Sequence, residues 1–196
     1  MFNLKNLFTR ALLALMLVTG AGAASAGPTY HVTIDTTSLS GTGFLDFLFS
    51  GDANSSGPAT ATVSNFSGNG TGVTTYGDVT PTATGAIFDN VNGFAEALIG
   101  VNLGGLFNFD LSFDVAPAGD GTTFSFALLN PTQDGYLGVD GDLAQFQLMP
   151  GSDTTVSSAN ALTSIALVSE VPEPATMASL MFGLALMGST LRARRK

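Results

Sequence analysis

The chain has 196 residues, a length that fits one domain of ordinary size with short specialised segments at its ends. The net charge is -9, and all six basic residues lie in the first ten or last five positions, whereas all fifteen acidic residues lie between Asp35 and Glu173. The segment between the two basic ends carries only negative charge and repels phosphate groups, which excludes nucleic-acid binding. The lack of cysteine excludes disulfides, thiolate metal sites and cysteine nucleophiles.

The N-terminal segment, residues 1–26, has the organisation of a secretory signal peptide. Two basic residues precede an apolar run at 11–18, and the small residues Ala24 and Ala26 follow it. The run is too short to cross about 30 Å of hydrocarbon, which argues against the alternative of a retained membrane anchor. We expect signal peptidase to recognise Ala24 and Ala26 and to cleave after Ala26, so that the remainder is exported.

Residues 27–170 are expected to form a single extracellular domain built from β-strands. In the segment 107–115, apolar side chains occupy the odd positions and polar side chains the even ones, which is the alternation of a half-buried strand. Shorter alternations of the same kind occur around 32–34, 45–49, 124–128 and 146–148.

The predicted strands are separated by short sequences rich in Gly, Asn, Asp and Pro, with no sustained helical period between them. This pattern favours an all-β fold, an antiparallel β-sandwich of the jelly-roll kind, flanked by an N-terminal signal helix and a C-terminal transmembrane helix. Two segments are ambiguous. Residues 88–99 fit a short helix or a strand, and residues 64–75 fit a long polar loop or a pair of weak edge strands.

Three acidic residues near glycine turns are candidate ligands of a metal ion. Asp134, Asp140 and Asp142 supply hard oxygen ligands of the kind that Ca²⁺ prefers. The full EF-hand pattern is absent, and Asp-Gly pairs are also ordinary turn sequences, so a structural Ca²⁺ and plain turns both fit these residues. No other cofactor is expected.

No residue pattern in the sequence argues for catalysis. His31 is the only histidine, which excludes a multi-histidine metal site, and we expect it to be an ordinary side chain on an edge strand. No Gly-x-Ser-x-Gly motif surrounds any serine. Asp110 and Asp114 share one parity of a strand, where alternate positions form the solvent face, so they do not argue for a glycosidase.

The chain also lacks tryptophan, so Tyr30, Tyr76 and Tyr136 are the candidates for stacking on a sugar, with structural packing as the alternative role. We therefore expect no catalytic residues and no enzymatic activity. A carbohydrate-active or other secreted hydrolytic enzyme is the alternative. A concave face with convergent carboxylates would favour the enzyme, and acids scattered over turns would favour a matrix protein.

The C-terminal segment, residues 171–196, combines three features in a fixed order. The first is the motif Val171, Pro172, Glu173 and Pro174. The second is an apolar stretch at 175–191, which as a helix measures about 26 Å, the short end of a bilayer span. The third is a basic tip of Arg192, Arg194, Arg195 and Lys196. The positive-inside rule holds that tip in the cytoplasm and leaves the preceding domain outside, in agreement with the signal peptide.

This tripartite end resembles the PEP-CTERM sorting signal of Gram-negative bacteria, and the segment 107–148 resembles the outer domain of a group of uncharacterised PEP-CTERM proteins. The first resemblance implies that an exosortase recognises the motif and removes the tail, after transient insertion of 175–191 in the inner membrane. A plain C-terminal anchor is the alternative. We expect a non-enzymatic protein of the cell surface or extracellular matrix, associated with exopolysaccharide through its acidic, hydroxyl-rich domain.

Overall fold

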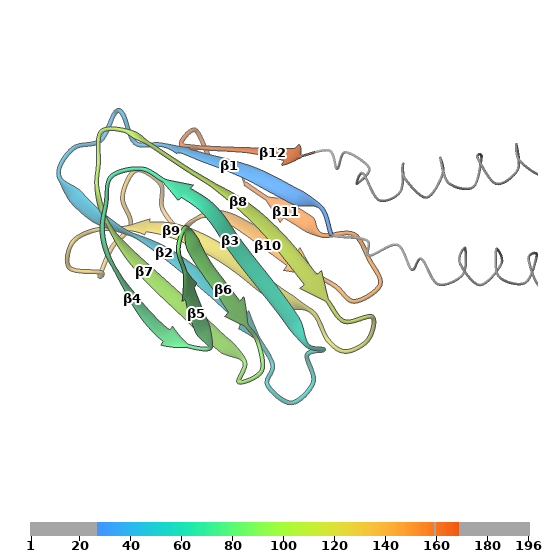
Figure 1. The fold of residues 1–196 in the computed structure, drawn as a ribbon. Coiled ribbons are helices and arrows are strands. Elements are labelled where there is room, and N and C mark those ends of the chain that lie inside the picture. The colour runs from blue at the N-terminus through green and yellow to red at the C-terminus, as the bar shows by residue number, and fades with distance from the viewer. Residues whose placement is uncertain (1–26, 159, 169–196) are drawn as a thin grey trace, which may run out of the picture.

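The computed structural model describes residues 27–158 and 160–168, and within them all regular structure is β-strand. The strands form two six-stranded antiparallel sheets that pack as a sandwich (Figure 1). In spatial order, sheet A contains β12 (Thr163–Val168), β1 (Thr29–Asp35), β8 (Leu106–Val115), β3 (Ala59–Ser67), β6 (Gly85–Asp89) and β5 (Val79–Thr82). Sheet B contains β11 (Thr155–Ser157), β10 (Asp142–Leu148), β9 (Thr122–Leu129), β2 (Thr42–Gly51), β7 (Phe94–Asn102) and β4 (Gly70–Gly77).

The connectivity of the first eight strands is that of a jelly roll. Strand β1 pairs with β8, β2 with β7 and β3 with β6, so that the chain folds back on itself as a nested set of antiparallel pairs. Strand β9 then pairs with β2, β10 and β11 extend sheet B beyond it, and β12 pairs with the free edge of β1. The predicted all-β jelly-roll sandwich is therefore confirmed, while the two predicted flanking helices lie outside the described residues.

The first and last described strands lie side by side. Thr29 at the start of β1 is the register partner of Val168 at the end of β12. The chain therefore enters and leaves the sandwich at the same end, as Figure 1 shows. The chain therefore leaves β12, in the direction of the motif, beside the N-terminal strand.

The core is formed by the alternate side chains that face inward from both sheets. In β8 the apolar positions 107, 109, 111 and 113 are all buried, as their alternation predicts. Phenylalanines fill most of the space, in edge-to-face pairs such as Phe47 with Phe109 and Phe109 with Phe126, whose ring centroids lie 5.2 and 5.4 Å apart. Phenylalanine packing between two sheets therefore holds together a domain that has no disulfide.

One buried polar side chain joins the loops at the end of the sandwich. Asn90 is only 4% exposed. Its Nδ2 donates to the backbone oxygen of Gly57 and to Oγ1 of Thr122, and its Oδ1 accepts a hydrogen bond from the backbone N–H of Ala59. Because every strong hydrogen-bonding group of the side chain is used, its burial carries no unpaired polar atom.

Both ambiguous segments contain strands. Residues 88–99 span the end of β6, a turn and the beginning of β7, with Gly93 at a φ of +80° in the turn. A helix in this segment is excluded, and the single strand becomes two. Residues 64–75 contain the end of β3 and most of β4, and β4 is the edge strand of sheet B with all of its residues exposed. The expectation of weak edge strands therefore holds for β4.

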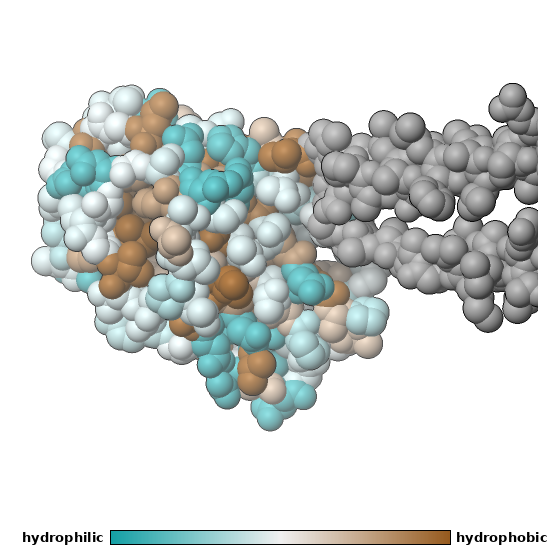
Figure 2. All heavy atoms as spheres, viewed as in Figure 1, coloured by the Kyte–Doolittle hydropathy of each residue, from teal (hydrophilic) through white to brown (hydrophobic). Residues whose placement is uncertain are grey.

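The outer surface is mostly polar, and its exposed apolar residues form only small separate clusters. Figure 2 shows the side seen in Figure 1 as a largely pale surface, in which hydrophobic and hydrophilic residues form separate small clusters. Exposed apolar side chains are scattered over several strands and loops, as with Val73, Phe94 and Leu167. Scattered apolar residues of this kind are normal on a protein surface.

Candidate functional site

The outer face of sheet B brings together acidic residues that are far apart in the sequence. Ala127 on β9 is the register partner of Asp46 on β2 and also of Asp142 on β10. The two aspartates are therefore separated by a single small residue across the sheet. On the other side of β2, Glu96 on β7 is the register partner of Leu48, which lies two residues after Asp46 on the same face of the strand. Three carboxylates from three strands therefore share one region of the face.

The loop that joins β9 to β10 forms a wall beside this face. Its start is organised by Asn130, whose Nδ2 donates to Oδ1 of Asp134 over 2.7 Å and whose Oδ1 accepts from the backbone N–H of Thr132 and of Asp134. An isolated bridge between Leu129 and Tyr136 then holds the loop against the end of β9. The segment 130–136 is thereby held beside the outer face of sheet B.

Sheet and loop together enclose a groove of about 620 Å³. Small residues of β9, Ala127 and Ser125, lie among the side chains that line it. Its polar lining consists of five carboxylates, one amide, one serine and one tyrosine, namely Asp46, Glu96, Asp134, Asp140, Asp142, Gln133, Ser125 and Tyr136. No Lys or Arg occurs anywhere between residues 27 and 168, so no cation of the described residues neutralises these groups.

Asp46 is the most perturbed of these carboxyl groups. Its partial burial, the negative charges of Glu96 and Asp142, and a hydrogen bond with Glu96 raise its pKa to about 7. Its Oδ1 is buried without a hydrogen-bond partner. At neutral pH this carboxyl group can therefore hold or release a proton, whereas an ordinary aspartate is fully ionised.

The three predicted calcium ligands all line the groove, but they are engaged differently. Asp134 accepts hydrogen bonds from Thr132 and Asn130, which hold the pKa of its carboxyl group below the ordinary value. Asp142 accepts a hydrogen bond of 2.7 Å from Gln145, and Asp140 is exposed in the loop. In the described part of the chain, no three Asp, Glu, His or Cys side chains are grouped closely enough to hold a metal ion. A structural Ca²⁺ at these residues stays a prediction.

The tyrosines differ in their availability for a ligand. Tyr136 is 48% exposed and lines the groove, and Tyr76 is half exposed on β4 outside it. Tyr30 is buried against Phe113 and Phe146 in the core, so its proposed role in sugar contact is wrong. Its parity explains this, because Tyr30 lies two residues before the buried Val32 on the same strand.

His31 lies on the outer face of sheet A, on a strand that is not an edge. The prediction of an edge strand is wrong because β12 pairs with β1 on the side opposite β8. Asp110 and Asp114 project from the solvent side of β8, as expected from their parity. Asp46 and Glu96 were missed as site residues, since each is only a polar position in an alternating strand.

The sorting segments lie outside the described residues. This applies to the signal-peptidase residues Ala24 and Ala26, the motif 171–174, the apolar stretch 175–191 and the basic tip. In the ranges 27–158 and 160–168, no helix is long and apolar enough to cross a membrane.

Comparison with known proteins identifies the C-terminal segment. Residues 170–196 match the family model of the PEP-CTERM protein-sorting motif. No curated protein and no solved structure matches the chain significantly. The motif implies an exported protein that is processed by an exosortase and sorted to the cell surface. The chain therefore combines this sorting motif with a jelly-roll domain that carries an acidic groove.

Proposed function

We propose that the jelly-roll domain is a non-enzymatic component of the cell surface or extracellular matrix, and that it binds exopolysaccharide in the groove of sheet B. The observation that carries this proposal is the groove itself. Its volume of about 620 Å³ is within the range of ordinary ligand sites, and exposed hydrogen-bonding groups line it next to a half-exposed tyrosine.

The lining supports a neutral polysaccharide as the ligand. Carboxylates accept hydrogen bonds from sugar hydroxyl groups, and the amide of Gln133 can donate as well as accept. The ring of Tyr136 offers an apolar face on which a sugar ring can stack. Five carboxylates with no neighbouring Lys or Arg repel uronic acids and sulfated sugars, so anionic polysaccharides are expected to bind poorly.

A binding assay with two matched tyrosine variants tests the proposal. We expect the protein to be retarded in affinity electrophoresis through gels that contain neutral exopolysaccharide. Tyr136→Ala should weaken this binding by about tenfold, the equivalent of a stacking contact of about 1.4 kcal/mol. Tyr76→Ala removes an equally exposed tyrosine outside the groove and should leave binding unchanged. Equal binding by all three proteins would contradict the proposed site.

A second candidate function, a carbohydrate hydrolase, is favoured by the environment of Asp46. A carboxyl group with a pKa of about 7 beside two other carboxylates is the arrangement that supplies a general acid and a base in glycoside hydrolysis. The carboxylates that converge in the groove are the feature expected of an enzyme, whereas the acidic residues that lie in turns elsewhere are the feature expected of a matrix protein. Asp46→Asn separates the two functions, since it should abolish any release of reducing ends while the variant still binds polysaccharide, because the carboxamide oxygen still accepts hydrogen bonds from sugar hydroxyl groups.

A further inference from the structure

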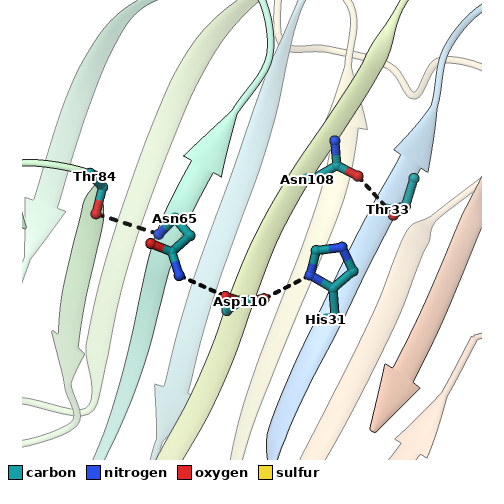
Figure 3. A network of polar contacts seen from close by, with 6 residues as sticks. All are labelled: His31, Thr33, Asn65, Thr84, Asn108 and Asp110. Carbon is teal, nitrogen blue, oxygen red and sulfur yellow. Dashed lines mark hydrogen bonds and ion pairs between the residues drawn. The ribbon is translucent and has the colours of Figure 1, made fainter. Parts of the chain in front are cut away.

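Two polar pairs on strands β1 and β8 form a compact block on the outer face of sheet A. His31 is the register partner of Asp110, and Thr33, two residues along β1, is the register partner of Asn108. Figure 3 shows both pairs side by side, with Asn65 on the far side of Asp110. The block lies on the opposite sheet from the groove and takes no part in the proposed binding site.

The first pair holds the imidazole in a defined orientation. Nδ1 of His31 lies 2.7 Å from Oδ1 of Asp110, and Nδ2 of Asn65 donates to Oδ2 of the same carboxylate over 2.7 Å. The hydrogen bonds from Asn65 and His31 hold the pKa of Asp110 below its ordinary value, so this carboxylate is an acceptor and Nδ1 is the donor. In the neutral imidazole, Nε2 is then a free proton acceptor, and it lies on the side of the ring nearer Thr33 (Figure 3).

The second pair places a nucleophile beside an electrophile. Oγ1 of Thr33 donates a hydrogen bond of 2.8 Å to Oδ1 of Asn108. A hydrogen bond of this length already places Oγ1 about 3.5 Å from Cγ of the carboxamide, which is near the distance for attack. Side chains directly opposite each other on antiparallel strands have Cβ atoms about 5 Å apart, and a two-atom bridge such as a disulfide spans about 3.8 Å, so the two strands must approach locally by about 1 Å for the bond to form.

We propose that Thr33 and Asn108 form an intramolecular ester that links β1 to β8 and releases ammonia. His31 accepts the proton of Oγ1 while this oxygen attacks Cγ of Asn108 and a new O–C bond forms. The C–N bond of the carboxamide then breaks, and the imidazolium returns the proton to the leaving nitrogen. In this acyl substitution the hydroxyl oxygen replaces the carboxamide nitrogen, so the products are an ester and ammonia. The reaction consumes no water and needs no oxidant or reductant.

Asp110 is a positioning residue in this reaction. It orients the ring and stabilises the imidazolium that forms transiently, as the aspartate of a Ser-His-Asp triad does. The reaction occurs once in the life of each molecule, so it needs no turnover. Fixed proximity of the two groups can supply an effective concentration on the order of 10⁵ M or more, which compensates for the low reactivity of a carboxamide.

The composition and the topology indicate what such a link would do. The chain has no cysteine, and no lysine occurs between residues 27 and 168, so disulfides and lysine isopeptides are unavailable to the domain. Strand β1 begins the described sandwich and pairs with β12, after which the sorting segment begins. A bond from β1 to the interior strand β8 would fix the N-terminal strand covalently to the middle of sheet A, and β12 would pair with a strand that is anchored in this way.

The test is peptide mass spectrometry of the exported protein after digestion with chymotrypsin. We expect the fragment that contains Thr33 to be joined to the fragment that contains Asn108, with a combined mass lower than their sum by one ammonia molecule. Thr33→Val and Asn108→Asp should abolish the joined fragment, and Thr33→Ser should retain it. His31→Gln should slow its formation severalfold in freshly made protein. Thr62→Val is the matched control, because Thr62 lies on the same face opposite Ser112 and should leave the link intact.

The loss of ammonia at two other asparagines must be distinguished from ester formation. The Asn69-Gly70 and Asn92-Gly93 sequences can also lose ammonia by forming a succinimide, but that loss stays within one fragment and persists in Thr33→Val. The proposal is overturned if the two wild-type fragments are always separate, or if the joined fragment still forms in Thr33→Val. Valine is common in strands and serine keeps the hydroxyl group, so at least one variant of Thr33 is expected to fold.

Discussion

The carboxyl group of Asp46 gives the domain a pH dependence opposite in direction to that of most carboxylates. Its pKa in the folded state is about 7, against an ordinary value of 3.8. Below the ordinary value both the folded and the unfolded chain carry the proton, and the contribution of this group to stability is fully present. As the pH rises through the folded value of about 7, the unfolded chain has released its proton first, so this contribution is lost.

The magnitude follows from the shift and from the exposure of the side chain. Three pKa units correspond to about 4 kcal/mol without screening. Because the groove is open and Asp46 is only partly buried, solvent screening reduces this to about 1–2 kcal/mol. Asp46→Asn removes the penalty, so at pH 8 the variant should be more stable than the wild type by about that amount, equivalent to about 5 °C in Tm.

Thermal unfolding of the two proteins between pH 4 and pH 8 measures the effect. The difference in Tm should be near zero at pH 4 and should grow with pH. Asp114→Asn is the matched control, since it removes the same charge from the exposed outer face of sheet A. If Asp46→Asn and Asp114→Asn changed Tm equally at every pH, or if Asp46→Asn were destabilising at pH 8, the reasoning about the groove would be refuted.

Three further substitutions, two of them with a matched control variant, test the packing of the sandwich by urea denaturation. Asn90→Ala should cost about 2–4 kcal/mol, because it leaves buried backbone groups without their partners. Phe124→Ala should cost about 3–5 kcal/mol since its ring packs between the sheets, whereas Phe94→Ala, at a position that is 42% exposed, should cost far less. Gly68→Ala should cost about 1–3 kcal/mol because the added Cβ would lie 2.2 Å from a phenylalanine ring at a positive φ, and Gly72→Ala, with open space around it, should not.

Local alternation in the sequence predicts most of the core because it depends only on neighbours two residues apart. The segment 107–115 becomes β8 with its odd positions buried, and the segment 45–49 lies within β2 in the same way. The sequence does not predict that residues 88–99 belong to two strands. The reason is local, because the turn that contains Gly93 interrupts an apolar pattern that otherwise reads as continuous. Apolar periodicity alone does not reveal such an interruption.

The order of strands in a sheet is a long-range property, and this is where prediction from the sequence ends. The sequence predicts an edge strand for His31 because nothing near it in the sequence shows that residues 163–168 pair with β1. The glycine-rich surroundings of Asp142 indicate a site residue, whereas Asp46 and Glu96 join the site only because β7, β2, β9 and β10 are neighbours in sheet B. The groove therefore emerges from the fold, while the sorting motif is complete within its own short segment.

Retention of the exported domain in the matrix tests the central claim, that the domain is sorted by its C-terminal motif and held by polysaccharide in the groove. The measurement is quantitative immunoblotting of cytoplasmic, membrane, exopolysaccharide and culture-medium fractions from cells that produce wild type, Tyr136→Ala, Tyr76→Ala or a deletion of 172–174. We predict that wild type and Tyr76→Ala are found trimmed in the exopolysaccharide fraction, that Tyr136→Ala is trimmed but released to the medium, and that the deletion stays in the membrane untrimmed. Wild-type protein of full length in the cytoplasm, or equal retention of Tyr136→Ala and wild type in the exopolysaccharide fraction, would contradict the account.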